Sequence, residues 1–377
     1  MRIKLKQAFD LQMGKTPARN NMEFWGGTHK WISIADLGNA GKYIDSTKES
    51  ISDEGVEASG IKIVPKGTVV MSFKLSIGKT AITSEDMYTN EAIIAFDNNG
   101  TYEIAADYLY HFCCGTNWGA GTNKAVMGLT LNKATLSEYE IEIPDISEQR
   151  EIAKKLDGVD TLIEKHRAQL VALDKLVKSR FIELFGNEKH RMMMSEVCSI
   201  ITDGTHQPPK FKREGIPFIF VSNIAEDRLT YNAEKFIDQE TYDELIKRTP
   251  IEIGDVLLST VGSYGHPAVV KSDKNFLFQR HIAYLKPRRE IVDSEFLHGA
   301  ILSSGVQAQI EKAVKGIAQK TLNLSEIKKM VIPVPTMDMQ KHFAAFVAEV
   351  DKSKHRSEYC RCKLIKLLQR LSSTEEE

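Results

Sequence analysis

Residues 144–152 read PDISEQREI, and a similar pattern returns 191 residues later as PTMDMQKHF over residues 335–343. In the first copy, an acidic or hydroxyl residue can cap a helix after the proline, and Gly-Asn at 186–187 offers a stop about 40 residues later. This predicts one long helix over 145–187. The returning pattern predicts a second long helix over 336–377, and these two helices decide the fold.

The segments upstream of the two predicted helices are duplicated as well. Residues 66–72, KGTVVMS, match 253–259, IGDVLLS, at a shift of 187. Residues 31–37, WISIADL, match 218–224, FIFVSNI, at the same shift. Two units of about 190 residues are too long for a solenoid repeat, so the sequence predicts a duplicated domain.

The part ahead of the first helix has the character of a β-rich domain. It consists of short β-branched and aromatic runs broken by Gly, Asn and Asp. We therefore predict an α+β fold with two β-rich globular domains, each followed by a long helix, and with the two helices paired as an antiparallel coiled coil around a pseudo-two-fold axis. The predicted segments are globular domain 1 over 1–144, helix 1 over 145–187, globular domain 2 over 188–335 and helix 2 over 336–377.

The helix pairing rests on a stripe of apolar residues that alternate by four and three positions. Either helix alone would be read as an amphipathic helix on its own domain, but two of them, each closing one copy, favour a pair. The predicted seam comprises Ile152, Leu156, Val159, Ile163, Leu170, Leu173 and Val177 in the first helix, and Phe343, Val347, Val350, Leu364 and Leu368 in the second. The second seam has a polar centre at Lys354, Ser357 and Arg361, which either sets the register or marks a shift of the seam.

Composition indicates a globular protein, and we expect it in the cytoplasm. No run of the 377 residues approaches the roughly 18 apolar residues of a membrane span, and no signal-peptide pattern follows Met1. The five cysteines form no Cys-x-x-Cys pair and have no histidines at ligand spacing, so reduced structural thiols are expected rather than a zinc site or a disulfide framework.

The charge is close to neutral in every segment. The net value of −1 divides into −3 over 1–144 (14 basic, 17 acidic), 0 over 145–187, +1 over 188–335 (20 basic, 19 acidic) and +1 over 336–377. A chain that binds nucleic acid alone usually carries a basic excess, because neutralised phosphates supply most of the affinity. If this chain reads DNA, we expect partner proteins to supply much of the binding affinity for DNA.

Motifs that carry catalysis are missing from the sequence. We find no phosphate loop of the Gly-x-x-x-x-Gly-Lys-Ser/Thr type, no strand-to-helix Gly-x-Gly-x-x-Gly and no Gly-x-Ser-x-Gly elbow. The only Pro-Pro pair, at 208–209, lacks the aromatic neighbour that amino-methyltransferase motifs carry. Active sites are assembled in space, so this does not exclude an enzyme, but it favours a binding subunit.

Residues 144–152 and 335–343 resemble the segments that open the two conserved helices in specificity (S) subunits of Type I restriction-modification systems. Residues 14–17, GKTP, and residues 203–208, DGTHQP, resemble the starts of two target-recognition domains. The resemblance covers essentially the whole chain. Each motif alone is weak, but their order and duplication together are specific.

The resemblance implies a non-catalytic targeting subunit. Each recognition domain would read one half of a bipartite site in double-stranded DNA, and the helices would fix the spacer and dock two methyltransferase (M) subunits. The resemblance leaves open whether restriction/translocase (R) subunits also bind, and it implies no membrane. The chain itself would bind no cofactor and no metal, because S-adenosylmethionine, ATP and Mg would belong to the partner subunits. Because the two copies differ at most globular positions, an asymmetric target is expected.

The candidate DNA-binding residues lie in glycine-containing loops and have basic, amide or hydroxyl side chains, the groups that contact phosphates and base edges. In the first domain they are Lys15, Thr16, Arg19, Lys74, Ser76, Lys79, Asn117, Asn123 and Lys124. In the second they are Thr205, His206, Gln207, Lys210, Ser263, Tyr264, His266, Lys315, Gln319 and Lys320. Each could equally be a solvated turn residue.

Two other classes of function stay open at this point. A freestanding DNA-modifying enzyme would methylate or cleave DNA as the purified chain. A protein-only coiled-coil scaffold would assemble with methyltransferase subunits but would show no sequence preference.

Overall fold

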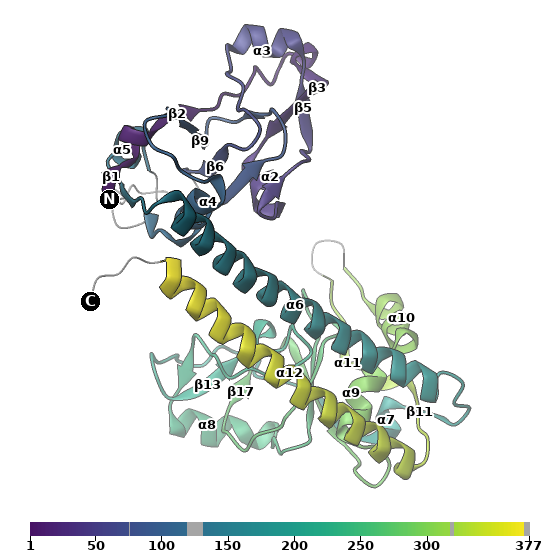
Figure 1. Cartoon of the computed structure of the whole chain (residues 1–377). Helices are drawn as coiled ribbons and strands as arrows, with labels where there is room; N and C mark the ends of the chain where they lie inside the picture. Colours follow the sequence, from purple (N-terminus) through teal and green to yellow (C-terminus); the bar gives the residue numbers. More distant parts are fainter. Residues whose placement is uncertain (75, 119–130, 317–319, 373–377) are drawn as a thin grey trace. The chain divides into compact units, whose positions relative to one another are not determined.

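The computed structural model describes residues 1–74, 76–118, 131–316 and 320–372, apart from the side chains of 368–372 (Figure 1). The chain forms two compact units, Met1–Arg167 with Tyr359–Glu377, and Ala168–Glu358. The predicted fold class is confirmed, because two β-rich regions are each followed by a long helix. None of the described helices combines the length and the apolar character that a membrane crossing requires.

The first unit is built around a five-stranded sheet. In spatial order its strands are β2 (Phe9–Met13), β9 (Ile93–Asn98), β6 (Val69–Ser72), β7 (Thr80–Thr83) and β4 (Tyr43–Ile44). All neighbours are antiparallel except β4 and β7. Successive residues of a strand point to opposite faces, so Val69 and Met71 belong to one apolar cluster and Val70 to another. The sheet is therefore covered on both faces.

Smaller elements complete this unit. A three-stranded sheet has the order β5 (Glu49–Ile51), β3 (Trp25–Ile32) and β8 (Tyr88–Thr89), and β1 (Arg2–Lys4) pairs with β10 (Glu140–Glu142). The helical segments are α1 (Leu5–Ala8), η1 (Met22–Phe24), α2 (Ile34–Asn39), α3 (Asp53–Ser59), α4 (Ala106–Gly115) and α5 (Lys133–Ser137). Ser33 and Ser52 cap α2 and α3 with their side-chain oxygens.

The second unit repeats this plan. Its central sheet has the order β12 (Cys198–Asp203), β18 (Ile282–Pro287), β15 (Val256–Ser259) and β16 (Pro267–Val269). The other strands are β14 (Phe236–Ile237), β13 (Ile216–Ile219) and β17 (Leu277–Phe278) in one sheet, and β11 (Arg191–Met193) with β19 (Val331–Pro333) in another. The helical segments are α7 (Met194–Val197), η3 (Val221–Asn223), α8 (Gln239–Leu245), η4 (Ile246–Arg248), α9 (Ser294–Leu302), α10 (Ser304–Ala313) and α11 (Leu324–Lys329).

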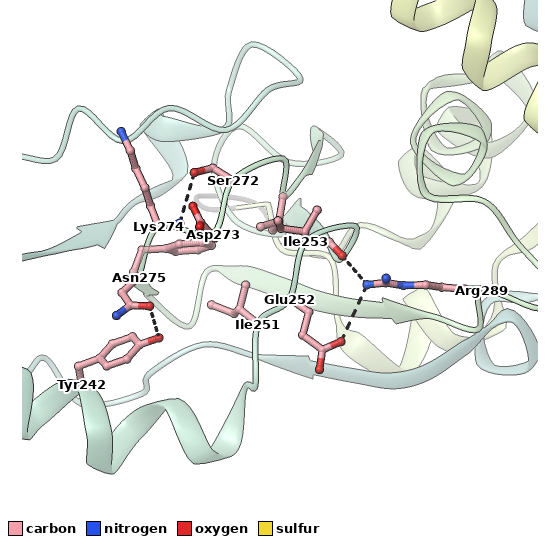
Figure 2. Close-up of a pocket in the computed structure, with 11 residues that line it drawn as sticks. Tyr242, Ile251, Glu252, Ile253, Ser272, Asp273, Lys274, Asn275 and Arg289 are labelled. Carbon is pink, nitrogen blue, oxygen red and sulfur yellow. Dashed lines mark hydrogen bonds and ion pairs between the residues drawn. The ribbon is translucent and has the colours of Figure 1, made fainter.

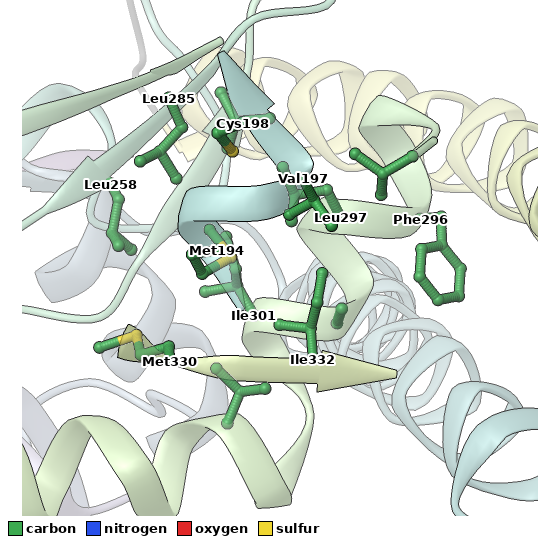
Figure 3. Close-up of a cluster of buried hydrophobic side chains, with 14 of the residues drawn as sticks. Met194, Val197, Cys198, Leu258, Leu285, Phe296, Leu297, Ile301, Met330 and Ile332 are labelled. Atoms are coloured by element: carbon green, nitrogen blue, oxygen red, sulfur yellow. The ribbon is translucent and has the colours of Figure 1, made fainter. Parts of the chain in front are cut away.

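The strand register shows that the two units are copies. Val70 of β6 lies opposite Ala95, and its sequence partner Leu257 of β15 lies opposite Tyr284. In the smaller sheets, β3 pairs in parallel with β8 and β13 pairs in parallel with β17. The core of the second unit joins the sheet residues Leu258 and Leu285 to Leu297 of α9 (Figure 3). The predicted internal duplication is therefore confirmed.

The two long helices, α6 (Ile146–Phe185) and α12 (Met337–Ser372), run antiparallel where the second unit contains both. Near the end of α6, the ring of Phe181 lies 5.3 Å from that of Phe343 near the start of α12. Further back along α6, Asp174 forms an ion pair of 2.6 Å with Lys354. Contacts that move toward the start of one helix as they move toward the end of the other define an antiparallel pair.

The polar centre of the second seam makes contacts between the helices. Ser357 is 3% exposed, and its hydroxyl donates to the side-chain oxygen of Gln169 on α6 at 3.2 Å. Together with the Lys354–Asp174 ion pair, this bond links the helices at fixed positions along their length. Of the two readings of the polar centre, these contacts favour a role in setting the register.

Burial along the helices follows the predicted stripe. Leu156, Val159, Phe343, Val347 and Val350 are buried, and the other described seam residues are half-buried. Four apolar residues of the first helix that lie off the stripe are exposed, namely Leu162, Val171, Leu176 and Ile182, whereas Ala153, Phe181 and Phe185, also off the stripe, are buried. The side chain of Leu368 lies outside the described residues. The assignment of every seam position to a contact between helices stays a prediction.

A buried glutamine fixes the start of each long helix. Gln149 is 0% exposed, and its amide nitrogen donates to the carbonyls of Glu103 and Pro144, at 3.0 Å each. Its amide oxygen accepts from the backbone N–H of Ala105 at 2.9 Å. Gln340, also 0% exposed, repeats these bonds with the carbonyls of Ile291 and Pro335 and the N–H of Asp293. Each helix is thereby tied to the segment that leads into α4 or α9.

The compact units do not end where the helices begin, since both helices are divided between them. The four-segment division of the chain at 144, 187 and 335 therefore stays our proposal.

Candidate nucleic-acid interface

In each unit, the loops chosen from the sequence converge at one end of the central sheet. In the first unit, the N–H of Phe73 donates to the carbonyl of Ala92 at 3.0 Å, and its carbonyl accepts from Leu131 at 3.2 Å. In the second, Thr260 makes the equivalent bonds with His281 at 2.9 Å and Leu322 at 2.8 Å. Three segments therefore meet at the same place in both copies: the hairpin loop after β6 or β15, the turn before β9 or β18, and the segment before α5 or α11.

The loop that follows β2 or β12 enters the same region through a glycine. A Cβ on Gly14 would lie 2.0 Å from the carbonyl oxygen of Thr89, and one on Gly204 would lie 2.3 Å from that of Phe278. Only glycine permits such a close approach of two backbones. Directly after these glycines, the N–H groups of Lys15 and Thr205 donate to the same two carbonyls, at 2.9 Å each. The glycines of the GKTP and DGTHQP motifs thus anchor this loop.

The hairpin loops after β6 and β15 have the same backbone framework. Gly78 and Gly265 adopt positive φ values of 88° and 83°, and their N–H groups donate to the carbonyls of Ser72 and Ser259, at 2.9 Å each. The two serine hydroxyls accept the N–H groups of the residues that follow these glycines. The framework is shared, whereas the side chains that it presents differ between the copies.

Several candidates of the first unit are held by neighbouring groups. Lys15 donates to the carbonyls of Ser59 and Gly60, at 3.0 Å each, at the carboxyl end of α3. Thr16 donates to the carboxylate of Glu91. Arg19 is paired with Glu49, and its guanidinium lies 3.9 Å from the centre of the Trp25 ring. The remaining described candidates are Ser76, Lys79 and Asn117, which are exposed, and Lys74, which is half-buried. Asn123 and Lys124 lie outside the described residues.

Candidates of the second unit also have polar neighbours. His206 lies 2.8 Å from Asp203, which also forms an ion pair of 2.6 Å with Arg248. Tyr264 donates to Glu311 at 3.0 Å. The other candidates are Thr205 and His266, which are half-buried, and Gln207, Lys210, Ser263, Lys315 and Lys320, which are exposed. Gln319 lies outside the described residues. Whether any of these residues touches DNA stays a prediction.

Three residues of this surface were missed in the sequence. Arg248 reaches it from η4 through its contact with Asp203. Arg280 and His281 form the turn before β18, and the N–H of Arg280 donates to the carbonyl of Thr205 at 3.0 Å. Burial, followed by the nearby charge of Arg280, lowers the pKa of His281. In the sequence, only the adjacent basic residues Arg280 and His281 between two apolar runs pointed to this turn, and such a pair is found in many charged turns.

The turn before the last sheet strand differs in charge between the copies. The backbone bonds of this turn correspond in the two copies, since the N–H groups of Asn90 and Gln279 donate to the carbonyls of Ile32 and Ile219. Counting from these bonds, Glu91 in the first unit occupies the place of Arg280 in the second. A carboxylate accepts hydrogen bonds, whereas a guanidinium donates them. The two loop surfaces therefore offer different hydrogen-bonding chemistry at one structural position.

A pocket of about 350 Å³ in the second unit lies at the other end of the sheet (Figure 2). It is lined by Glu252 and Ile253, which lead into β15, and by Arg289, which follows β18. Because β15 and β18 are antiparallel, these residues lie opposite the end where the loops converge. Arg289 is held by the carbonyl of Ile253. The pocket is separate from the candidate interface.

The described residues offer little for catalysis. Among them, no group of three or more His, Cys, Asp or Glu side chains is arranged to hold a metal. Burial raises the pKa of Cys198 to about 12, so its thiol is uncharged and unreactive at neutral pH. The geometry instead offers two loop surfaces of different polarity on related frameworks.

Comparison with known proteins gives a consistent family. Residues 1–173 and 192–359 match a family model described as the Type I restriction modification DNA specificity domain. The chain is 27% identical to the Type I restriction enzyme MjaIX specificity subunit of Methanocaldococcus jannaschii, over 91% of this chain and 85% of that protein. It is 23% identical to the EcoBI specificity subunit of Escherichia coli, over 76% and 68% of the two chains.

Two solved structures share the fold. One is a chain from work on complex assembly and conformational transition of the type I R-M system, with a TM-score of 0.62, 17% identity and coverage of 99% of this chain and 96% of that chain. The other is the S subunit of a Type I restriction-modification system from M. genitalium, with a TM-score of 0.52, 14% identity and coverage of 99% and 94%.

Proposed function

Because the chain belongs to the family of Type I restriction-modification DNA specificity subunits, we propose that each of its two globular domains reads one half of a bipartite, asymmetric DNA target. The chain is the DNA specificity subunit of such a system, a non-catalytic component that targets a methyltransferase and restriction complex. The finer features, namely the two half-sites, the fixed gap and the individual partner subunits, are our proposal.

The observation that carries the proposal is the convergence of equivalent loops on two copies of one framework. Corresponding backbone bonds at Phe73 and Thr260 bring each set of loops to the same end of its sheet. Two copies that present surfaces of the same construction are suited to two stretches of the same polymer. Different side chains at equivalent places, such as Glu91 and Arg280, would prefer different bases, because carboxylates accept from cytosine and arginine donates to guanine. The target is therefore proposed to be asymmetric.

The paired helices supply the fixed gap in this proposal. At 1.5 Å per residue, the helices α6 and α12, of 40 and 36 residues, are about 60 Å and 54 Å long. Their antiparallel contacts, including those of Lys354 and Ser357, hold one helix against the other at a set register. A DNA site with the wrong gap would have to bend or twist to fit, which costs free energy.

The partners follow from the family and from the charge. With a net charge of −1, the chain lacks the basic excess of proteins that hold DNA alone. We infer that two methyltransferase subunits dock on the helices and help to enclose the DNA, and that restriction subunits join some assemblies. S-adenosylmethionine, ATP and Mg would serve those partners, and the methyl transfer would take place on them.

The first experiment is sequencing of methylated bases in cells that express this chain with its cognate methyltransferase, compared with cells that lack only this chain. We expect an asymmetric two-part motif with one fixed gap, which disappears with the chain. An assembled complex that gives no motif would contradict the proposal and would favour a scaffold.

A second measurement tests the ruler itself. One heptad inserted into each long helix, at matching points of the pair, lengthens both by about 10 Å and preserves the stripe. We expect both half-site preferences to persist while the preferred gap changes. An unchanged gap would show that the helices do not set it.

A further inference from the structure

A lysine joins the first globular domain to its long helix. Lys42, just before β4, reaches both carboxylate oxygens of Asp157 on α6, at 2.6 and 2.7 Å, and a carboxylate oxygen of Asp107 on α4 at 2.7 Å. Its side chain is only 18% exposed. Asp157 also bonds to His111, which is buried at 3% exposure. The lysine thus sits where strand, short helix and long helix meet.

The second unit has a similar but more exposed arrangement from a different part of the chain. Lys271, just after β16, forms ion pairs of 3.0 Å with Glu295 on α9 and 2.9 Å with Asp351 on α12. Glu295 and Asp107 are each the second residue of their helix. In both units, one lysine from the sheet therefore bridges the first turn of the short helix and an aspartate of the long helix.

The two lysines are not counterparts in the duplicated sequence. Lys42 precedes the edge strand that pairs with β7, whereas Lys271 leaves the strand β16, which is itself the counterpart of β7. The helix partner differs too, because the sequence counterpart of Asp351 is Asp160, one turn beyond Asp157. An ion pair inherited from the duplicated ancestor would occupy matching positions. Because the two bridges use residues at non-matching positions, they indicate the same structural requirement in both units rather than inheritance from the duplicated ancestor.

Both lysines keep their charge, although their surroundings differ: the side chain of Lys42 is 18% exposed, whereas that of Lys271 is 55% exposed. Burial alone would lower the pKa of Lys42, but hydrogen bonds to Asp107 and Asp157 outweigh it and raise the pKa overall. The same balance, with Glu295 and Asp351 as the acids, raises the pKa of Lys271. A charged lysine that holds two acids on different elements resists rotation of one element against the other, because rotation lengthens at least one ion pair.

We propose that Lys42 and Lys271 are positioning residues that fix the angle between each recognition domain and its long helix, and so set how strictly the complex discriminates the gap between half-sites. This proposal rests on the proposed function. A domain of this size has a radius of gyration of about 15 Å. A rotation of roughly 13° at the joint would then move the loops by about one base-pair step of 3.4 Å.

The test uses the full chain with its cognate methyltransferase and a plasmid library in which the gap between the two half-sites is varied one base pair at a time. The variants are Lys42→Met, Lys271→Met and the double variant. We expect both half-sites to be kept, while the preference for the native gap over gaps one base pair longer or shorter falls about fivefold in the double variant. Lys42→Arg and Lys271→Arg, which keep the charge, should restore most of the preference.

Matched controls distinguish the effect of losing the bridge from the effect of losing an ordinary ion pair within one helix. Lys155→Met removes an exposed pair with Glu151 within α6, and Lys352→Met removes one with Glu349 within α12, so both should leave the gap preference unchanged. If the methionine variants do not accumulate, Asp157→Asn and Asp351→Asn, which leave the lysines one acid each, carry the test. A native gap preference in the double variant, or in these asparagine variants, overturns the proposal. A wild-type complex without any two-part motif would instead contradict the proposed function.

Discussion

Replacement of Gln149 by leucine tests whether the buried amide holds the first long helix to its domain. Leucine has a similar volume but cannot make the three hydrogen bonds to Glu103, Pro144 and Ala105. Each such bond contributes about 1 kcal/mol, and an orphaned buried N–H costs about 1–3 kcal/mol. Burial of the apolar side chain returns roughly 1–2 kcal/mol. We therefore expect the free energy of unfolding to fall by about 3 kcal/mol.

The assay can report on this unit alone. All three tryptophans of the chain, Trp25, Trp31 and Trp118, lie in the first unit, so their fluorescence follows its unfolding. For a unit of this size, a loss of about 3 kcal/mol corresponds to a decrease in Tm of roughly 6–12 °C.

The control for this substitution is Gln12→Leu in the same unit, where the amide also donates to two carbonyls but is exposed to solvent. Water replaces those bonds, so the Tm should change by less than about 2 °C. Equal shifts for the two variants would refute the reasoning, because the effect would then come from the leucine side chain rather than from the buried network.

Two other predictions concern packing and charge. Gly299→Ala should lower the free energy of unfolding by about 1–3 kcal/mol in chemical denaturation, because the new Cβ would lie 2.8 Å from Phe343 and 3.1 Å from Phe181. Gly305→Ala is the control, and it should be neutral or stabilising because a Cβ there has nothing within 4 Å. Similar losses for the two variants would count against tight packing at Gly299. Hydrogen bonds to Lys4 and Lys6 lower the pKa of Glu138 from 4.5 to about 2. The ionised carboxylate therefore stabilises the fold above about pH 4.5, and this contribution is lost as the pH falls toward 2. The Tm of Glu138→Gln should depend less on pH across this range than that of the wild type, and an unchanged profile would show that the ion pairs are too solvated to matter.

The duplication and the long helices could be predicted because they depend on local chemistry. The long helices follow from a cap, a stripe and a stop, and Gly78 and Gly265 occupy turn positions that require positive φ. Such signals lie within a few residues of one another. They were sufficient for the fold class and for selecting the glycine-containing loops, but not for predicting that these loops meet.

The partners of individual side chains could not be predicted, because they come from distant segments. Lys15 and Arg19 were candidates as basic loop residues, yet their contacts are with Ser59, Gly60 and Glu49. Arg280 was passed over because a charged turn has no distinguishing pattern. The bridges of Lys42 and Lys271 were invisible for a stronger reason, since they do not align between the copies.

The antiparallel pairing of α6 and α12 also imposes an order on synthesis. About 150 residues separate the end of α6 from the start of α12, and at 5–20 residues per second a ribosome needs roughly 8–30 s to make them. During that time Leu170, Leu173 and Val177 of the predicted seam have left the ribosome before the second helix exists. The nascent chain thus carries an uncovered stripe that a chaperone or a waiting subunit could shield until the last helix is made.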